Sequence, residues 1–128
     1  HPAIGELTWR GEINEENFGR EIAPARTFGF LKQAQELRKR GLALGASLEN
    51  TIVLDDQGPL SPLRFPDEYV RHKVLDLLGD LFYLGGGLTG VWRVFRGGHS
   101  LHLALVRGLL ALPSGPLASG APPSQGGA

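Results

Sequence analysis

The spacing of apolar side chains predicts three strands in this 128-residue chain. Residues 6–13 alternate loosely between apolar and polar positions, and residues 51–54 and 88–95 are rich in β-branched or aromatic side chains. Turn-forming residues at 55–58 close the middle strand. Residues 26–30, with two aromatic rings and a glycine, are expected to form a compact loop or turn.

Helical spacing and end signals predict four helices among these segments. The first begins at Asn14 and ends before Pro24, and the second spans residues 31–40. The third, at residues 66–84, is the strongest, because a proline in the first turn and two acids suit the start of a helix. The last spans about residues 101–112, with Ser100 or His99 near its cap. Helices and strands mixed without strict alternation favour an α+β fold.

Composition narrows the classes of function. The chain has 13 basic and 13 acidic side chains, so it lacks the basic bias of a nucleic-acid-binding protein. No segment approaches the roughly 20 apolar residues of a membrane span, and no secretory signal pattern is present. The absence of cysteine excludes disulfides, thiolate ligands and a cysteine nucleophile, and it suits the cytosol.

The ends of the chain are also informative. The sequence contains no methionine and begins at His1, which favours a piece of a longer protein whose function needs residues from elsewhere. Residues 1–112 are expected to form one domain. Residues 113–128 are Pro, Gly, Ser and Ala for the most part, and are expected to be a disordered tail.

The strongest helix carries the main candidate chemistry. His72, Asp76 and Asp80 are spaced i, i+4 and i+8, so they share one stripe of a mostly apolar helix. Such groups are costly to bury unless they are paired or bind a ligand. His-x-x-x-Asp suits a zinc ion, although a catalytic zinc needs about three protein ligands and this helix offers two. An exposed polar stripe or a structural His–Asp hydrogen bond remains the alternative.

Other candidates have two interpretations each. His99 follows two glycines, and facing a carboxylate such as Asp80 would favour its protonated form, a good general acid; otherwise it is a cap or loop residue. Thr27 could donate to an oxyanion or cap a helix. Lys73 could meet a phosphate or sugar hydroxyl, or remain solvated.

Three further features are expected to be structural on the pattern alone. Phe28 and Phe30 are typical of core positions, and His102 is expected to be structural or on the surface. The small residues at 41–48 could leave room for an apolar chain, or could allow close backbone packing.

Several segments, in order, resemble one family, the UDP-3-O-acyl-N-acetylglucosamine deacetylases, which are the zinc amidases of bacterial lipid A synthesis. The resemblance is to their C-terminal domain and extends from His1 to about Leu110. The segments are Ala25-Arg-Thr-Phe-Gly-Phe30, Gly41-Leu-Ala-Leu-Gly45, Ser47-Leu-Glu-Asn50, Leu63-Arg-Phe65, Asp67-Glu68, Val70-Arg-His-Lys-Val-Leu-Asp76, Gly79-Asp80 and Gly97-Gly-His-Ser-Leu101.

The resemblance implies a role for each matching residue. His72 and Asp76 would bind zinc or iron, and Asp80 would partner the catalytic His99. Thr27 would lie beside the tetrahedral centre. The implied substrate contacts are Lys73, Phe28, Phe30 and Gly98. The implied fold is a two-layer sandwich of helices on a small mixed or antiparallel sheet, with residues 41–52 as an insert that lines an acyl-chain passage.

The implied activity is hydrolysis of the N-acetyl group of a UDP-linked acylated N-acetylglucosamine in the cytoplasm, with release of acetate. In this family the third zinc ligand and the general base lie in an N-terminal domain, so this chain alone is expected to be incomplete. Ala46 and His102 stand where the family usually has glycine and asparagine. The alternative is a non-catalytic lipid- or nucleotide-binding module, which would be expected to lose the metal and acid residues that are present together here.

Overall fold

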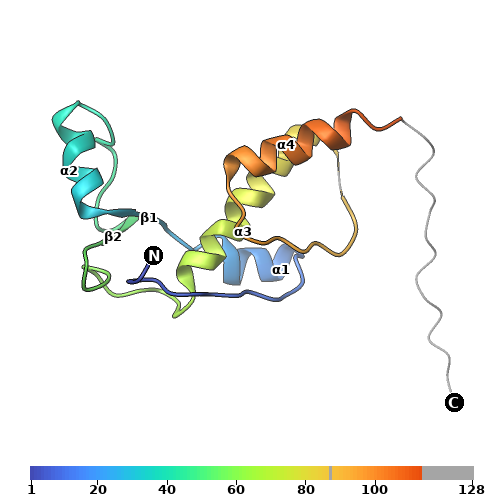
Figure 1. Cartoon of the computed structure of the whole chain (residues 1–128). Helices are drawn as coiled ribbons and strands as arrows, with labels where there is room; N and C mark the ends of the chain where they lie inside the picture. The colour runs from blue at the N-terminus through green and yellow to red at the C-terminus, as the bar shows by residue number, and fades with distance from the viewer. Residues whose placement is uncertain (87, 114–128) are drawn as a thin grey trace, which may run out of the picture.

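The computed structural model describes residues 1–86 and 88–113, and in that part the chain has an α+β fold with a small two-stranded sheet (Figure 1). The elements follow one another as helix α1 (Glu15–Asn17), π-helix η1 (Phe18–Ile22), strand β1 (Thr27–Phe30), helix α2 (Leu31–Lys39), strand β2 (Thr51–Leu54), helix α3 (Glu68–Leu81), 3-10 helix η2 (Phe82–Leu84) and helix α4 (His99–Leu110).

The sheet pairs β1 with β2 in parallel, from Thr27 beside Thr51 to Phe30 beside Leu54. The prediction of a mixed or antiparallel sheet is therefore wrong. The prediction of a loop at residues 26–30 is also wrong, because β1 forms there. Parallel strands need a crossover between them, and α2 with the segment after it provides this one. The antiparallel contact in this region is an isolated bridge between Leu54 and Pro59.

Two expected strands do not form. Residues 6–13 and 88–95 join no sheet in the part of the chain that the structure describes. A strand is stabilised by the ladder of hydrogen bonds to its neighbour, and the apolar pattern of these segments finds no such neighbour here. Val91 and Phe95 are instead 91% and 78% exposed.

The helices are close to their expected positions. The Asn14 side chain accepts a hydrogen bond from the Asn17 amide (2.9 Å), which confirms the expected helix start. α2 ends where expected, since Gly41 follows it with φ +73°. The third helix is shorter than its expected 66–84, because its last turn tightens into η2 before Gly85 at φ +69°. α4 begins two residues earlier than expected.

α3 connects the two ends of the molecule. Figure 1 shows the sheet and α2 at one end and α3 with α4 side by side at the other. At the sheet end, Ile52, Leu54 and Tyr69 form the buried core, with Phe28 and Phe30 packed against it. α3 contacts both β1 and α4. Side chains along α3 can therefore meet groups from the segment before β1 and from α4.

Two further expectations concern whole segments. The tail expected at residues 113–128 lies, apart from Pro113, outside the described residues. None of the helices in residues 1–86 and 88–113 has the length and apolar character needed to cross a membrane.

Candidate metal and acid site

α3 carries the three expected polar side chains along one stripe. His72, Asp76 and Asp80 all lie within this helix, and their side chains are 16%, 15% and 13% exposed. The expected spacing is confirmed, and all three groups are largely removed from water. Each must therefore be paired or bind a ligand, and the two ends of the stripe do so differently.

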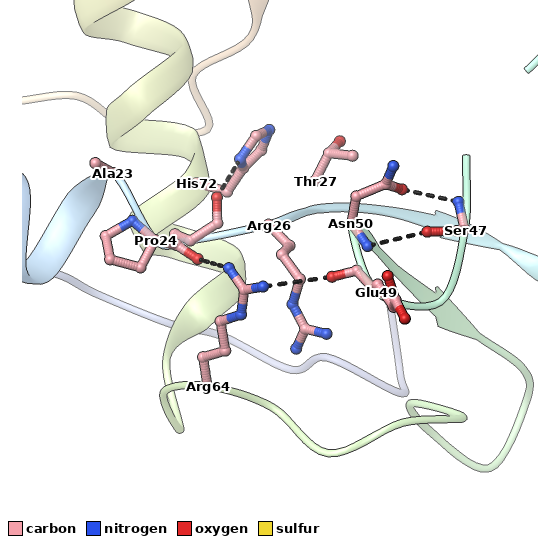
Figure 2. A pocket seen from close by; sticks show the side chains of 10 residues that line it. Ala23, Pro24, Arg26, Thr27, Ser47, Glu49, Asn50, Arg64 and His72 are labelled. Carbon is pink, nitrogen blue, oxygen red and sulfur yellow. Dashed lines mark hydrogen bonds between the residues drawn. The ribbon is translucent and has the colours of Figure 1, made fainter. Parts of the chain in front are cut away.

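His72 is oriented by the backbone that precedes β1. Its Nδ1 lies 3.0 Å from the carbonyl oxygen of Ala25 (Figure 2), and because a carbonyl only accepts, Nδ1 must carry the proton. This leaves the lone pair of Nε2 facing Asp76 Oδ1 at 3.2 Å. Two acceptors at that distance need a proton or a cation between them.

This pair fits a zinc ion. Ligand atoms about 2.0–2.2 Å from a tetrahedral zinc lie roughly 3.3–3.6 Å apart, close to the spacing of His72 Nε2 and Asp76 Oδ1. A histidine that binds zinc commonly donates its other ring N–H to a carbonyl or carboxylate, as His72 does to Ala25. The donor types and their orientation therefore suit the expected metal.

A buried ion pair fixes the segment that carries Ala25. Glu68, at the start of α3, is fully buried and accepts hydrogen bonds from the Arg26 amide (3.0 Å), the Arg26 guanidinium (2.9 Å) and the Arg64 amide (2.6 Å). Burial alone would raise the pKa of Glu68, but these hydrogen bonds outweigh it and lower the pKa to about 2. The sequence pattern indicates Glu68 only as an acid at the start of a helix, and it does not single out Arg26.

At the other end of the stripe, Asp80 partners His99. His99 Nδ1 lies 2.7 Å from Asp80 Oδ2, so the expected juxtaposition is confirmed. Burial opposes ionisation of Asp80, but hydrogen bonds and charge attraction from His99 and His102 lower its pKa below the usual value. His99 Nε2 lies 3.9 Å from Asp76 Oδ1, which places the outer ring nitrogen beside the carboxylate that faces His72.

His102 is a member of the site that sequence reasoning left out. It is 2% exposed, and its Nδ1 lies 2.9 Å from the same Asp80 oxygen that His99 contacts. Asp80, His99 and His102 offer atoms within 4.8 Å of one another and have metal-ligating chemistry. The distances to Asp80 are those of hydrogen bonds, however. The signal in the sequence was the spacing of His99 and His102, which places them on one helix face.

Thr27 borders a hollow of about 450 Å³ that opens beside His72 (Figure 2). The far wall comes from the end of the crossover, where Asn50 and Ser47 are hydrogen-bonded to each other. From outside the crossover, the guanidinium of Arg64 donates to the carbonyl oxygens of Pro24 and Glu49. The hollow is lined by Ala23, Pro24, Ala25, Arg26, Thr27, Ser47, Glu49, Asn50, Arg64 and His72.

The expected substrate-contacting residues are not gathered in one place. Lys73 Nζ lies 3.5 Å from Asp76 Oδ2 and 5.6 Å from the centre of the Phe28 ring. Phe28 packs edge-on against Tyr69, and Phe30 lies beside the ring of His1. Gly98 directly precedes α4 and His99. Their roles stay predictions.

Comparison with known sequences places the chain in a family of deacetylases. The match covers residues 1–111 and is to the UDP-3-O-acyl N-acetylglycosamine deacetylases. The chain belongs to this family.

Curated relatives agree with this assignment. The UDP-3-O-acyl-N-acetylglucosamine deacetylase of Nautilia profundicola is 52% identical over 112 residues, which are 87% of this chain and 38% of that protein. The proteins of the same name from Thermodesulfovibrio yellowstonii and Myxococcus xanthus are 50% and 45% identical over 86% and 89% of this chain. The chain thus spans a little over one third of the length of these relatives.

Proposed function

We propose that this chain supplies the C-terminal half of the active site of a zinc-dependent amidase. The reaction is hydrolysis of the N-acetyl group of UDP-3-O-acyl-N-acetylglucosamine, the committed step of lipid A synthesis. The observation that carries the proposal is that three side-chain atoms lie close together. His72 Nε2 faces Asp76 Oδ1, and His99 Nε2 lies 3.9 Å from that same oxygen. Membership of the deacetylase family supports it.

His72 and Asp76 are the metal ligands in this proposal, with zinc preferred and iron as the other candidate. When bound, the metal polarises the amide carbonyl and lowers the pKa of a water molecule towards about 7. The third ligand and the general base come from an N-terminal domain of the same polypeptide. Ala25 keeps the proton of His72 on Nδ1, so that Nε2 is free to coordinate.

The acid chemistry belongs to His99. The carboxylate of Asp80 accepts a hydrogen bond from Nδ1–H of His99, and this bond directs Nε2 of His99 towards the proposed ligand Asp76. A proton on Nε2 stabilises the oxyanion and then passes to the leaving nitrogen as the C–N bond breaks, and the products are acetate and a free amine. Thr27 donates a hydrogen bond at the tetrahedral centre from the edge of the hollow that it shares with His72.

The remaining residues contact substrate in this proposal. Lys73 meets a phosphate or sugar hydroxyl, while Phe28, Phe30 and Gly98 contact the sugar and acyl groups. Residues 41–52 line the acyl-chain passage. Their apolar side chains Leu42, Leu44 and Leu48 are 54%, 74% and 55% exposed, which suits contact with an acyl chain.

Residues 1–112 form the C-terminal half-domain in this proposal, a two-layer sandwich of helices packed on the small sheet. The substrate is a UDP-linked sugar, which suits a cytoplasmic enzyme.

A zinc titration tests the split site. The chain alone is expected to bind zinc weakly, because it supplies two of about three ligands. Mixing it with the N-terminal half of the same polypeptide is expected to tighten binding and to produce deacetylase activity. Tight binding by the chain alone would show that a third ligand lies within these residues, and the split-site proposal would be wrong.

Two variants of the assembled enzyme separate ligand from acid. His72→Ala is expected to lose the metal and the activity together. His99→Ala is expected to retain the metal and to lose most turnover, typically 10²- to 10⁴-fold for a general acid. Full zinc occupancy in His72→Ala, or normal turnover in His99→Ala, would contradict the corresponding assignment.

A further inference from the structure

We infer that His102 is a positioning residue that holds the Asp80 carboxylate in place for His99. This inference rests on the proposed role of His99 and adds a residue to it. The sequence placed His102 in the last helix without a function. In the structure, His102 contacts Asp80, the partner of His99, from the interior of the protein.

The first observation is that two imidazoles share one oxygen. His99 Nδ1 and His102 Nδ1 lie 2.7 and 2.9 Å from Asp80 Oδ2. The two rings have opposite exposure, since the His99 side chain is 64% exposed and that of His102 is 2% exposed. Asp80 thus connects an outer histidine, free to meet substrate, with an inner one enclosed by protein.

The second observation concerns the proton on His102. The carboxylate only accepts, so Nδ1 of His102 carries a proton and donates it to Asp80. Nε2 is buried and has no hydrogen-bond partner in the described part of the chain. Leaving a buried N–H donor unpaired is costly, so the proton belongs on Nδ1 and the lone pair on Nε2.

The third observation is that the ring has little freedom to leave this position. A Cβ at Gly97 would lie 2.7 Å from His102 Nε2, so the backbone before α4 closes directly over the ring. The amide of His102 also donates to the carbonyl of Gly98 (2.9 Å) in the first turn of α4. The donor to Asp80 is therefore held by rigid backbone.

A fixed donor matters because a carboxylate bonded only to an exposed side chain can rotate. The terminal torsion of aspartate is broad, and the His99 side chain, which is 64% exposed, has little protein around it to restrain the pair. The bond from His102 restricts that torsion. His99 Nε2 then stays oriented towards Asp76 between catalytic cycles. A reacting group needs such a fixed orientation.

The hydrogen bond itself can be observed in this chain without any activity. Long-range ¹H–¹⁵N spectra distinguish the two tautomers of each histidine. We expect His102 as the Nδ1–H tautomer, with a ring proton that exchanges slowly and whose resonance shifts in Asp80→Asn. The Nε2–H tautomer, or no change in Asp80→Asn, would overturn the inference whatever the enzymatic function is.

Variants of the assembled enzyme test the catalytic consequence. His102→Phe keeps the ring and removes the donor, and it is expected to lower kcat about 10- to 100-fold, as loss of a supporting hydrogen bond typically does. KM and zinc content are expected to stay unchanged. His102→Asn is expected to recover most of the activity, because its amide nitrogen occupies the δ position. His102→Gln, whose amide occupies the ε position, serves as the matched control and is not expected to recover it.

Each other outcome contradicts a different statement. Unchanged kcat in His102→Phe, or equal losses in the Phe, Asn and Gln variants, would overturn the positioning role. Loss of zinc in His102→Phe would identify His102 as a ligand and overturn it as well. If the unmodified assembled enzyme had no deacetylase activity, the proposed function would fail, while the tautomer spectra would still decide the hydrogen bond.

Discussion

At the scale of single residues, Glu68 is a fully buried charged group that lies outside the proposed catalytic set. Its carboxylate is fully buried and accepts from Arg26 and from the Arg64 amide. Ala25, which orients His72, and Thr27, which borders the hollow, flank Arg26 directly. Glu68 therefore fixes the segment that carries both Ala25 and Thr27.

The lowered pKa of Glu68 predicts a dependence of stability on pH. With a pKa of about 2 instead of its ordinary 4.5, the carboxylate stabilises the fold fully above about pH 4.5. This contribution, on the order of 3 kcal/mol, is lost as the pH falls from about 4.5 towards 2. Denaturant unfolding at a series of pH values between about 2 and about 6 measures it.

Glu68→Gln is the comparison for that experiment. It removes the titrating group, so its free energy of unfolding is expected to be lower near neutral pH and to fall less steeply below about pH 4.5 than that of the unmodified chain. Other carboxylates titrate in both proteins and cancel in the difference. Parallel profiles for the two proteins would contradict the assignment of this pH dependence to Glu68.

At the scale of elements, local signals predicted what local interactions determine. The Asn14 cap, the stop at Gly41 and the spacing of His72, Asp76 and Asp80 all act within one or two helical turns, and all are present in the structure. The family resemblance named the remaining candidate residues. The sequence pattern alone left His99, Thr27 and Lys73 with two interpretations each and indicated only core positions for Phe28 and Phe30.

The features that sequence analysis missed depend on partners far along the chain. β1 forms because residues 27–30 pair with residues 51–54, and the intrinsic pattern of 26–30 had indicated a turn. Glu68 meets Arg26 across 42 residues, and His102 meets Asp80 across 22. Periodicity and capping rules describe neighbours along the chain only. They could therefore not predict this strand or these two hydrogen bonds, which depend on tertiary contacts.

The entry into α4 provides a prediction at this scale. A Cβ at Gly97 would lie 2.7 Å from His102 Nε2 and 2.8 Å from Val94 Cγ1. Gly97→Ala is therefore expected to destabilise the chain by about 1–3 kcal/mol, as overpacking does. Thermal or denaturant unfolding measures the loss.

Gly90→Ala is the matched control, because a Cβ there meets nothing within 4 Å. Combining Gly97→Ala with His102→Asn removes the ring atom from one of the two close contacts. The cost of the alanine is then expected to be smaller than in the unmodified background. Equal costs in both backgrounds would mean that His102 does not limit this turn.

At the scale of the whole molecule, many large apolar side chains remain in contact with water. Among residues 1–86 and 88–113, Phe82, Val91 and Phe95 are 88%, 91% and 78% exposed. Residues 88–95 and 6–13 have the composition of strands but join no sheet there. This exposed apolar surface is what the proposed N-terminal domain would cover.

Hydrogen exchange tests that arrangement. In the chain alone, amides of residues 6–13 and 88–95 are expected to exchange quickly, because no strand pairs with them in the described part of the chain. Adding the N-terminal half is expected to slow both segments, while residues 31–39, at the far side of the sheet, serve as the internal control. Equal exchange with and without the partner would contradict the proposed covering of these segments.

The parallel pairing of β1 and β2 also has an evolutionary consequence. The register of the two strands is fixed by their four residue pairs, whereas the crossover from Leu31 to Asn50 is tied to neither α3 nor α4 by a helix or strand contact. A lineage can lengthen, shorten or recompose that crossover while Ala25 stays opposite His72. Variation in the far wall of the hollow is thereby separated from inheritance of the proposed metal ligands, and the two can change at different rates.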